Sequence, residues 1–143
     1  MANLLAAQST LLNDASGAVV NIIGFGGNVA TATHLKGGAA STALMLASAG
    51  LASAYAGKGV RVNASNPGRA FTERPQEGMQ AEARQQGISI EEALTRSKAT
   101  NPLGRAAEPS AIADAVVYLA SNRTSYITGA MVAMDGSVTP MVV

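Results

Sequence analysis

Few side chains in this sequence could transfer a proton near neutral pH. His34 is the only histidine, and an imidazole exchanges a proton in this range. Lys36 follows two residues later rather than one helical turn away, so the two are not paired on one helix face. A lone histidine in a loop is more often a solvated side chain than an acid. His34 is therefore one candidate acid with a simpler alternative, and no metal site is predicted.

The other tyrosine, lysine and arginine candidates are expected to have structural roles rather than catalytic ones. Tyr55 falls deep in a helical stretch, so we expect it to pack. Lys58 and Arg61 follow it, and we expect both to face solvent. Cysteine is absent, which excludes disulfides and thiolate catalysis.

Three glycines occur directly after an apolar run. Residues 18–23 read AVVNII, a pattern typical of a strand that is covered on both faces. The GFGG at residues 24–27 follows this strand but leads into a loop that runs on to Lys36. A turn that cradles a pyrophosphate opens into a helix N-terminus instead. We therefore interpret these glycines as positions of close backbone approach.

Alternating strand and helix patterns predict an α/β fold with a parallel sheet. The predicted strands cover residues 18–23, 59–65 and 130–134, and the predicted helices cover 2–14, 37–57 and a stretch from 108 onward. Residues 69–98 are more polar, with helical pieces at 77–84 and 89–98, and such long excursions often cover a substrate. Strands joined through helices imply parallel pairing with crossover connections.

Composition and charge exclude several classes of protein. The 143 residues suffice for one domain, and 48% hydrophobic with 13% charged residues argues against disorder. A formal net charge of +1 on scattered basic residues gives no case for nucleic-acid binding. We find no apolar run of the roughly 20 residues that span a bilayer and no signal-like N-terminus. We therefore expect a cytoplasmic protein with no membrane contact.

Short motifs stand in a fixed order along the chain. They are GVRVN at residues 59–63, NPG at 66–68, PLGR at 102–105, EP at 108–109, SYITG at 125–129 and DG at 135–136. This series resembles the C-terminal half of the short-chain dehydrogenase/reductase family. The resemblance implies the C-terminal part of a Rossmann-like doubly wound parallel sheet, three strands with flanking helices. It also implies that residues 1–143 lack the family's N-terminal dinucleotide-binding half.

The resemblance places the family's catalytic positions on residues without the required groups. The family uses a serine to orient the carbonyl, a tyrosine to donate the proton and a lysine four residues later. Counted back from residues 59–63 without gaps, the tyrosine position is Gly37 and the lysine position is Ser41. The serine position, after the strand, is Gly24. None of the three can do the family's chemistry, which leaves His34 as the candidate acid.

NAD or NADP is the cofactor that the resemblance implies. Pro67 and Gly68 would present backbone to the nicotinamide, and Thr72, four residues past Gly68, would hydrogen-bond it. Alternatively, Pro67 and Gly68 form a plain turn and Thr72 is a loop hydroxyl. Because the pyrophosphate turn is missing and Ser41 replaces the lysine that holds the ribose, we expect this chain alone not to bind either nucleotide.

The sequence leaves three functions open. The chain is an oxidoreductase by resemblance but inactive alone, or a non-catalytic assembly subunit, or a binding module that uses the former substrate cleft. An assembly subunit would form a homo-oligomer or join a full-length family member. The resemblance implies an interface through the helices at 2–14 and 37–57, although their small residues could equally pack on the chain's own sheet. The strand at 18–23 would lose its family neighbour and expose an apolar edge, which also favours association.

Overall fold

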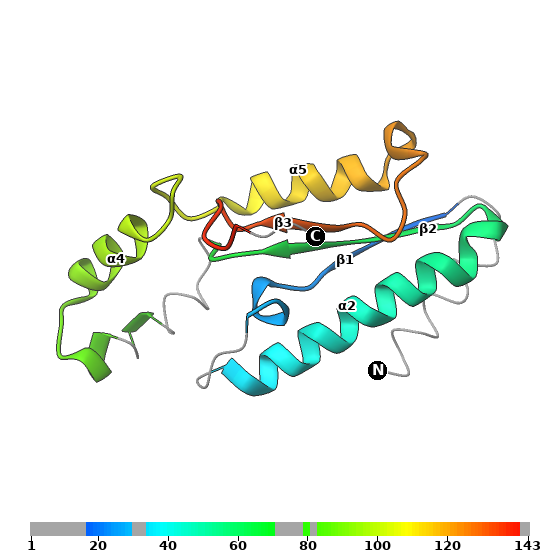
Figure 1. Cartoon of the computed structure of the whole chain (residues 1–143). Helices are drawn as coiled ribbons and strands as arrows, with labels where there is room; N and C mark the ends of the chain where they lie inside the picture. The colour runs from blue at the N-terminus through cyan, green and yellow to red at the C-terminus, as the bar shows by residue number, and fades with distance from the viewer. Residues whose placement is uncertain (1–16, 30–33, 71–78, 81–82, 141–143) are drawn as a thin grey trace.

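The chain folds into three strands with helices on both sides (Figure 1). The computed structural model describes residues 17–29, 34–70, 79–80 and 83–140; the predicted helix at 2–14 and Thr72 lie outside these ranges. The strands are β1 (Ala18–Ile22), β2 (Arg61–Pro67) and β3 (Met131–Met134). The helices are α2 (Leu35–Tyr55), α4 (Ile90–Ala99) and α5 (Pro109–Ala120). Short 3₁₀ turns are η1 (Phe25–Gly27), η3 (Ala56–Lys58) and η4 (Asn122–Thr124).

The strands form one parallel sheet in the order β1-β2-β3, which confirms the predicted fold class. β2 is central, and its Ala64 pairs with Asn21 of β1 and with Met131 of β3. Pairing on both edges and cover on both faces explain why residues 62–66 are all buried. β2 begins two residues later than predicted because Gly59 closes η3 in a left-handed conformation, with φ 76°.

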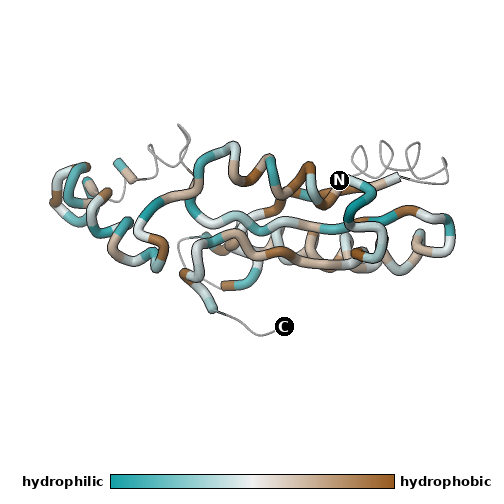
Figure 2. Tube along the Cα trace, turned by 90° about the horizontal axis from the view of Figure 1, so that it is seen from above, coloured by the Kyte–Doolittle hydropathy of each residue, from teal (hydrophilic) through white to brown (hydrophobic). Residues whose placement is uncertain are grey.

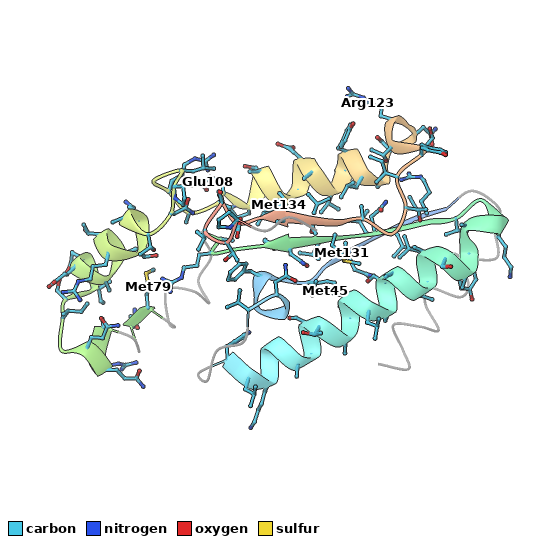
Figure 3. All side chains as sticks on the ribbon, viewed as in Figure 1. Met45, Met79, Glu108, Arg123, Met131 and Met134 are labelled. Atoms are coloured by element: carbon cyan, nitrogen blue, oxygen red, sulfur yellow. The ribbon has the colours of Figure 1, made fainter. Side chains whose placement is uncertain are left out.

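Helices α2 and α5 cover opposite faces of the sheet (Figure 1). On the α2 side, Ala52 packs with Val60 and Val62 in the main apolar cluster. Met45 of α2 and Met131 of β3 lie between that helix and the sheet (Figure 3). The small apolar cluster is the core that holds α2 on the sheet.

A buried polar contact also joins α2 to the sheet. The amide Nδ2 of Asn21 in β1 donates to Ser48 Oγ over 2.8 Å, and Ser48 Oγ donates to the Leu44 carbonyl within the helix. Ser48 is fully buried. Its small side chain lets the helix approach the sheet closely, and the hydrogen bonds offset the cost of burying a hydroxyl.

Arg61 holds the end of α5, so the expectation that it faces solvent is wrong. Its guanidinium donates to the carbonyls of Leu119 at 2.9 Å and Ser121 at 3.0 Å, and to Thr124 Oγ1 at 2.9 Å. The last carbonyls of a helix lack partners within the helix and carry partial negative charge. A cation from the first residue of β2 therefore satisfies the C-terminus of α5.

Most of α2 faces away from the sheet. Only Ser48 and Ala52 are buried, while Leu46 in the middle is 77% exposed. Contrary to the expectation of no such segment, the helical stretch 35–58 is by length and composition long and apolar enough to cross a membrane. In this structure it lies along the sheet, and no other described helix packs on its exposed, largely apolar face.

Helix α4 projects at one end of an elongated molecule, where hydrophilic positions predominate (Figure 2). Ser89 caps its N-terminus by accepting a hydrogen bond from the Glu92 amide over 3.1 Å. Glu92 also forms a 2.6 Å ion pair with Arg96, one turn later. This cap and this ion pair explain why a helix forms here although it buries little apolar surface. The helix confirms the helical piece predicted at 89–98.

Candidate functional site

The C-terminal ends of the three parallel strands meet at one edge, where open α/β sheets bind ligands. Glycines follow each strand there: Gly24 after β1, Gly68 after β2 and Gly136 after β3. The two predicted cofactor contacts that the structure describes, Pro67 and Gly68, therefore lie at the expected edge.

Gly68 is required by packing. Its amide donates to the Met134 carbonyl over 3.2 Å, and a Cβ built at this position would lie 2.9 Å from the Asp135 Cα. Asp135 is buried, and its carboxylate accepts hydrogen bonds from the amides of Ser137 and Thr139. The ends of β2 and β3 thus touch through their backbones, which explains Gly68 without a nicotinamide.

Gly24, at the predicted serine position, has a backbone that only glycine adopts readily. Its φ is 126° and its ψ is 150°. Nothing lies within 4 Å of a Cβ built there, so space does not forbid a side chain. The positive φ does, because an L-residue there is strained by roughly 1–3 kcal/mol. A serine at this position requires the loop to change course.

His34 occupies the space beside Gly37, the predicted tyrosine position. A Cβ built at Gly37 would overlap the Cε1 and Nε2 atoms of the imidazole. On the other side, a Cβ at Gly26 would lie only 2.7 Å from His34 Cδ2. The imidazole thus lies between two glycines from separate segments, at an exposed position. The imidazole of His34, the predicted acid, therefore occupies the space that a side chain at Gly37, the predicted tyrosine position, would need.

The turn η1 rests directly on the first turns of α2. A Cβ at Gly27 would lie 3.0 Å from Ser41 Cβ and 2.6 Å from Met45 Sδ, and Thr42 Oγ1 donates to the Gly27 carbonyl over 2.9 Å. The Gly26 carbonyl oxygen would lie 2.8 Å from a Cβ at Gly38. Ser41, at the predicted lysine position, therefore lies close to the backbone of Gly27. This confirms the interpretation of Gly26 and Gly27 as positions of close approach, whereas it is wrong for Gly24, which has nothing within 4 Å of a Cβ.

The described segment after β1 does not offer the turn that holds the pyrophosphate of a nicotinamide dinucleotide. A pyrophosphate needs free backbone amides at a helix N-terminus. The amides after β1 instead belong to a three-residue 3₁₀ turn packed against α2 and His34. The position expected to hold the ribose is an uncharged serine covered by Gly27. Within residues 17–29, 34–70, 79–80 and 83–140, no group of three metal-binding side chains occurs either.

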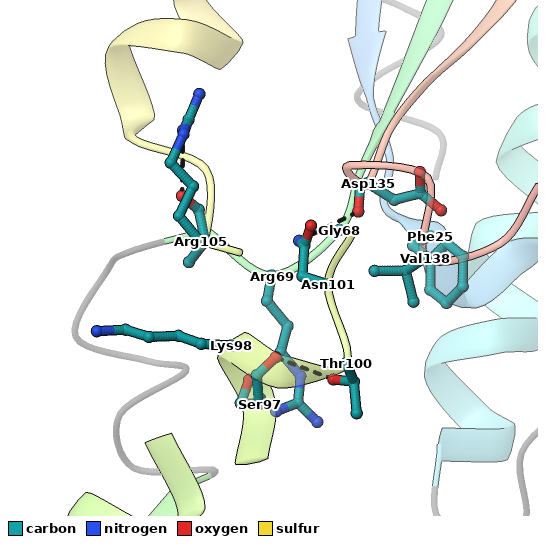
Figure 4. Close-up of a pocket in the computed structure, with 11 residues that line it drawn as sticks. Phe25, Gly68, Arg69, Ser97, Lys98, Thr100, Asn101, Arg105, Asp135 and Val138 are labelled. Atoms are coloured by element: carbon teal, nitrogen blue, oxygen red, sulfur yellow. Dashed lines mark hydrogen bonds between the residues drawn. The ribbon is translucent and has the colours of Figure 1, made fainter. Parts of the chain in front are cut away.

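A pocket of about 220 Å³ opens at the same edge (Figure 4). Gly68 lines it, whereas His34, Gly37 and Ser41 do not. Its other walls come from the segment after β1, the end of α4, the α4–α5 connection and the segment after β3. The lining residues that the sequence analysis did not single out are Phe25, Arg69, Ser97, Lys98, Thr100, Asn101, Arg105, Ala106, Asp135 and Val138.

Asn101 explains how this pocket is held together. Its Oδ1 accepts a hydrogen bond from the Leu103 amide over 2.9 Å, and its Nδ2 donates to the Asp135 carbonyl over 3.4 Å. The turn at residues 101–105 is thereby fixed against the end of β3. Asn101 directly precedes the PLGR motif at residues 102–105, so the signal for this contact lay one residue before a segment that resembles the family.

Comparisons with known proteins define the class of this fold. A family model described as enoyl-(acyl carrier protein) reductase matches residues 1–139. The chain is 36% identical over 126 residues to galactitol 2-dehydrogenase (L-tagatose-forming) of Cereibacter sphaeroides, covering 87% of this chain and 46% of that protein. This chain belongs to the short-chain dehydrogenase/reductase family, as the motif series predicted.

Two further relatives bear on activity and cofactor. An inactive 2-(S)-hydroxypropyl-CoM dehydrogenase 2 of Xanthobacter autotrophicus is 33% identical, with 94% of this chain and 56% of that protein covered. The structure of an actinorhodin polyketide ketoreductase with NADPH superposes with a TM-score of 0.87 at 26% identity, covering 98% of this chain and 54% of that one. The chain spans about half the length of the curated relatives it matches.

Proposed function

We propose that this chain is the C-terminal half of a short-chain dehydrogenase/reductase fold that does not catalyse hydride transfer by itself. One observation carries the proposal: the His34 imidazole fills the space from which a tyrosine side chain at Gly37 would start. The backbone of Gly24 and the cover over Ser41 support it independently. At the positions assigned to the family's tyrosine and lysine, His34 and the Gly27 backbone lie close by, and at the position assigned to the serine the backbone of Gly24 disfavours a side chain.

The proposal extends to the cofactor. NAD or NADP is what the family resemblance implies, and an NADPH complex of a relative supports a nicotinamide nucleotide for the family. This chain lacks the turn for the pyrophosphate and the charge for the ribose. It therefore binds neither nucleotide in isolation.

Calorimetry and a reductase assay test both parts. NADH and NADPH are titrated into the whole chain, and oxidation of each is followed with a panel of small ketones. We expect no heat of binding and no turnover. Micromolar affinity for either nucleotide contradicts the proposal. Turnover that His34→Ala abolishes would also contradict it and would make His34 the acid.

A second function, assembly, rests on the outer edge of β1. β1 pairs with β2 through the backbones of its odd-numbered residues, since Gly17 O accepts from Arg61 N and Ile23 N donates to Ser65 O. The N–H and C=O groups of Ala18, Val20 and Ile22 therefore point to the other edge. No described strand pairs there. Unpaired apolar edges recruit further strands.

The exposed face of α2 adds to this edge. Leu35 and Leu46 are 68% and 77% exposed, and no charged residue interrupts the helix between Lys36 and Lys58. A surface of this kind on a soluble protein is typical of an interface. We propose that the chain associates with a second copy, or with a full-length family member that offers the same surfaces.

Light scattering across a dilution series tests association. Val20→Pro removes only an N–H that points away from β2, so it blocks strand addition at the outer edge while sparing the pairing with β2. Val20→Ala is the control, because it removes more of the apolar side chain than Val20→Pro does and keeps the N–H. We expect an oligomeric wild type, a weakened Val20→Pro and an intermediate or unchanged Val20→Ala. A wild type that is monomeric at high concentration excludes self-association, and co-purification with a full-length relative then decides the alternative.

A further inference from the structure

The pocket at the carboxyl edge combines an apolar wall with three cationic side chains. Phe25 and Val138 form the apolar part, and Arg69, Lys98 and Arg105 supply the charges. We call this cavity the edge pocket. Its residues come from the segments after all three strands and from the α4–α5 connection, so it is a product of the fold rather than of one loop.

The negative charge in the lining is already engaged. Asp135 is the one acidic residue among the described lining residues, and both its carboxylate oxygens accept backbone hydrogen bonds, from Ser137 and Thr139. Lys98 and Arg105 form no ion pair among the described residues, and the bond recorded for Arg105 is a 3.3 Å contact with its neighbour's carbonyl. The lining thus carries an excess of positive charge.

The three cations have different roles in the wall. Arg69 Nη1 donates to Ser97 Oγ over 2.9 Å, which ties the segment after β2 to the last turn of α4. Lys98 and Arg105 extend from the wall in different directions (Figure 4), and both are exposed. Their charged ends point away from Phe25 and Val138 (Figure 4), and their long, exposed side chains can rotate toward a bound group. A cleft lined by one sign of charge concentrates ligands of the opposite sign.

We propose that the edge pocket binds a small molecule with an anionic oxygen group, a carboxylate or a phosphate, on a short apolar body. The anionic group lies against Lys98 and Arg105, and the apolar body lies against Phe25 and Val138. At a liquid volume of about 30 Å³ per water, the pocket equals roughly seven waters, which suits a ligand of about six to eight heavy atoms. The proposal is independent of catalysis, because binding requires neither a proton donor nor a nucleotide.

Amide chemical-shift titrations of the whole chain test this with three probes of similar size. The probes are butyrate, n-propyl phosphate and the neutral butyramide. We expect both anions to shift the amides of Gly68, Asn101 and Asp135 saturably, and to bind more weakly as ionic strength rises. The tighter of the two anions identifies the group that the pocket prefers. Butyramide should bind several-fold more weakly.

Substitutions locate the charge. Lys98→Gln and Arg105→Gln should each weaken binding of the anions about two- to fivefold, as expected for exposed charge pairs, and the double variant should lose more. Lys58→Gln, an exposed lysine whose ammonium lies over the Tyr55 ring, is the matched control and should change nothing. Equal binding of butyramide, an unaffected double variant, or no saturable shift with either anion overturns the proposal.

Discussion

Replacing Arg61 should be among the most damaging single changes to the stability of this chain. Five acceptors surround its guanidinium: the carbonyls of Leu119, Ala120, Ser121 and Ile127 and the hydroxyl of Thr124. Three of these hydrogen bonds measure 2.9–3.0 Å. Arg61→Met keeps most of the apolar stem and removes all five donors. At about 1 kcal/mol for each of the three short bonds, the expected loss is roughly 3 kcal/mol.

Urea denaturation followed by far-UV circular dichroism measures this loss. A domain of this kind has only about 5–15 kcal/mol of stability, so the midpoint should fall clearly. Arg61→Lys, which can still reach one or two carbonyls, should cost about half as much. Arg123→Ala is the control, because Arg123 lies at the far end of α5 from the edge pocket and only stacks over Tyr118 (Figure 3). An Arg61→Met variant as stable as Arg123→Ala would refute the assignment of Arg61 as the partner of the α5 C-terminus.

Three further substitutions probe other contacts by the same denaturation assay. Asn63→Ala removes a fully buried side-chain amide that donates to the Ile127 carbonyl and accepts from the Ala130 amide. It should lower the free energy of unfolding by about 2–3 kcal/mol. A decrease no larger than that of a surface substitution would contradict the buried pairing. Gly68→Ala should cost about 1–3 kcal/mol because its Cβ meets Asp135, whereas Gly50→Ala, in open space on α2, should be neutral or stabilising. Ser89→Ala should cost about 1 kcal/mol through loss of the α4 cap, and Ser89→Asp should restore it.

The fold could be predicted because its signals are local. The run AVVNII and the helix that begins with Pro109 each indicate their structure within a few residues. The turn expected at residues 66–68 is wrong for Asn66 and Pro67, because both continue β2 and pair with β3. The role of Arg61 is not local, because its acceptors lie about 60 residues further along the chain. Alternation along β2 predicts only that Arg61 and Asn63 share a face. Which helix end meets that face depends on the packing of α5.

In the candidate site, too, only the local features could be predicted from the sequence. Counting along the chain identified Gly24, Gly37 and Ser41 as replaced positions, and that assignment stays a prediction. Position counting could not show that His34 fits between Gly26 and Gly37, because those glycines come from segments that meet only after folding. The edge pocket escaped prediction for the same reason, since each of its walls is an ordinary loop in the sequence.

The placement of His34 has a consequence for any attempt to restore the missing side chains. Gly37→Tyr alone starts a ring in space that the exposed His34 imidazole now occupies, so the imidazole must turn aside before a tyrosine can take its place. His34→Ala first empties that space, and Gly24→Ser additionally needs a new course for the loop. Ser41→Lys places a longer side chain at a half-buried position beside the Gly27 backbone. Restoring the family's triad at the assigned positions therefore calls for changes at His34 and in the loop after β1 as well as at the three positions themselves.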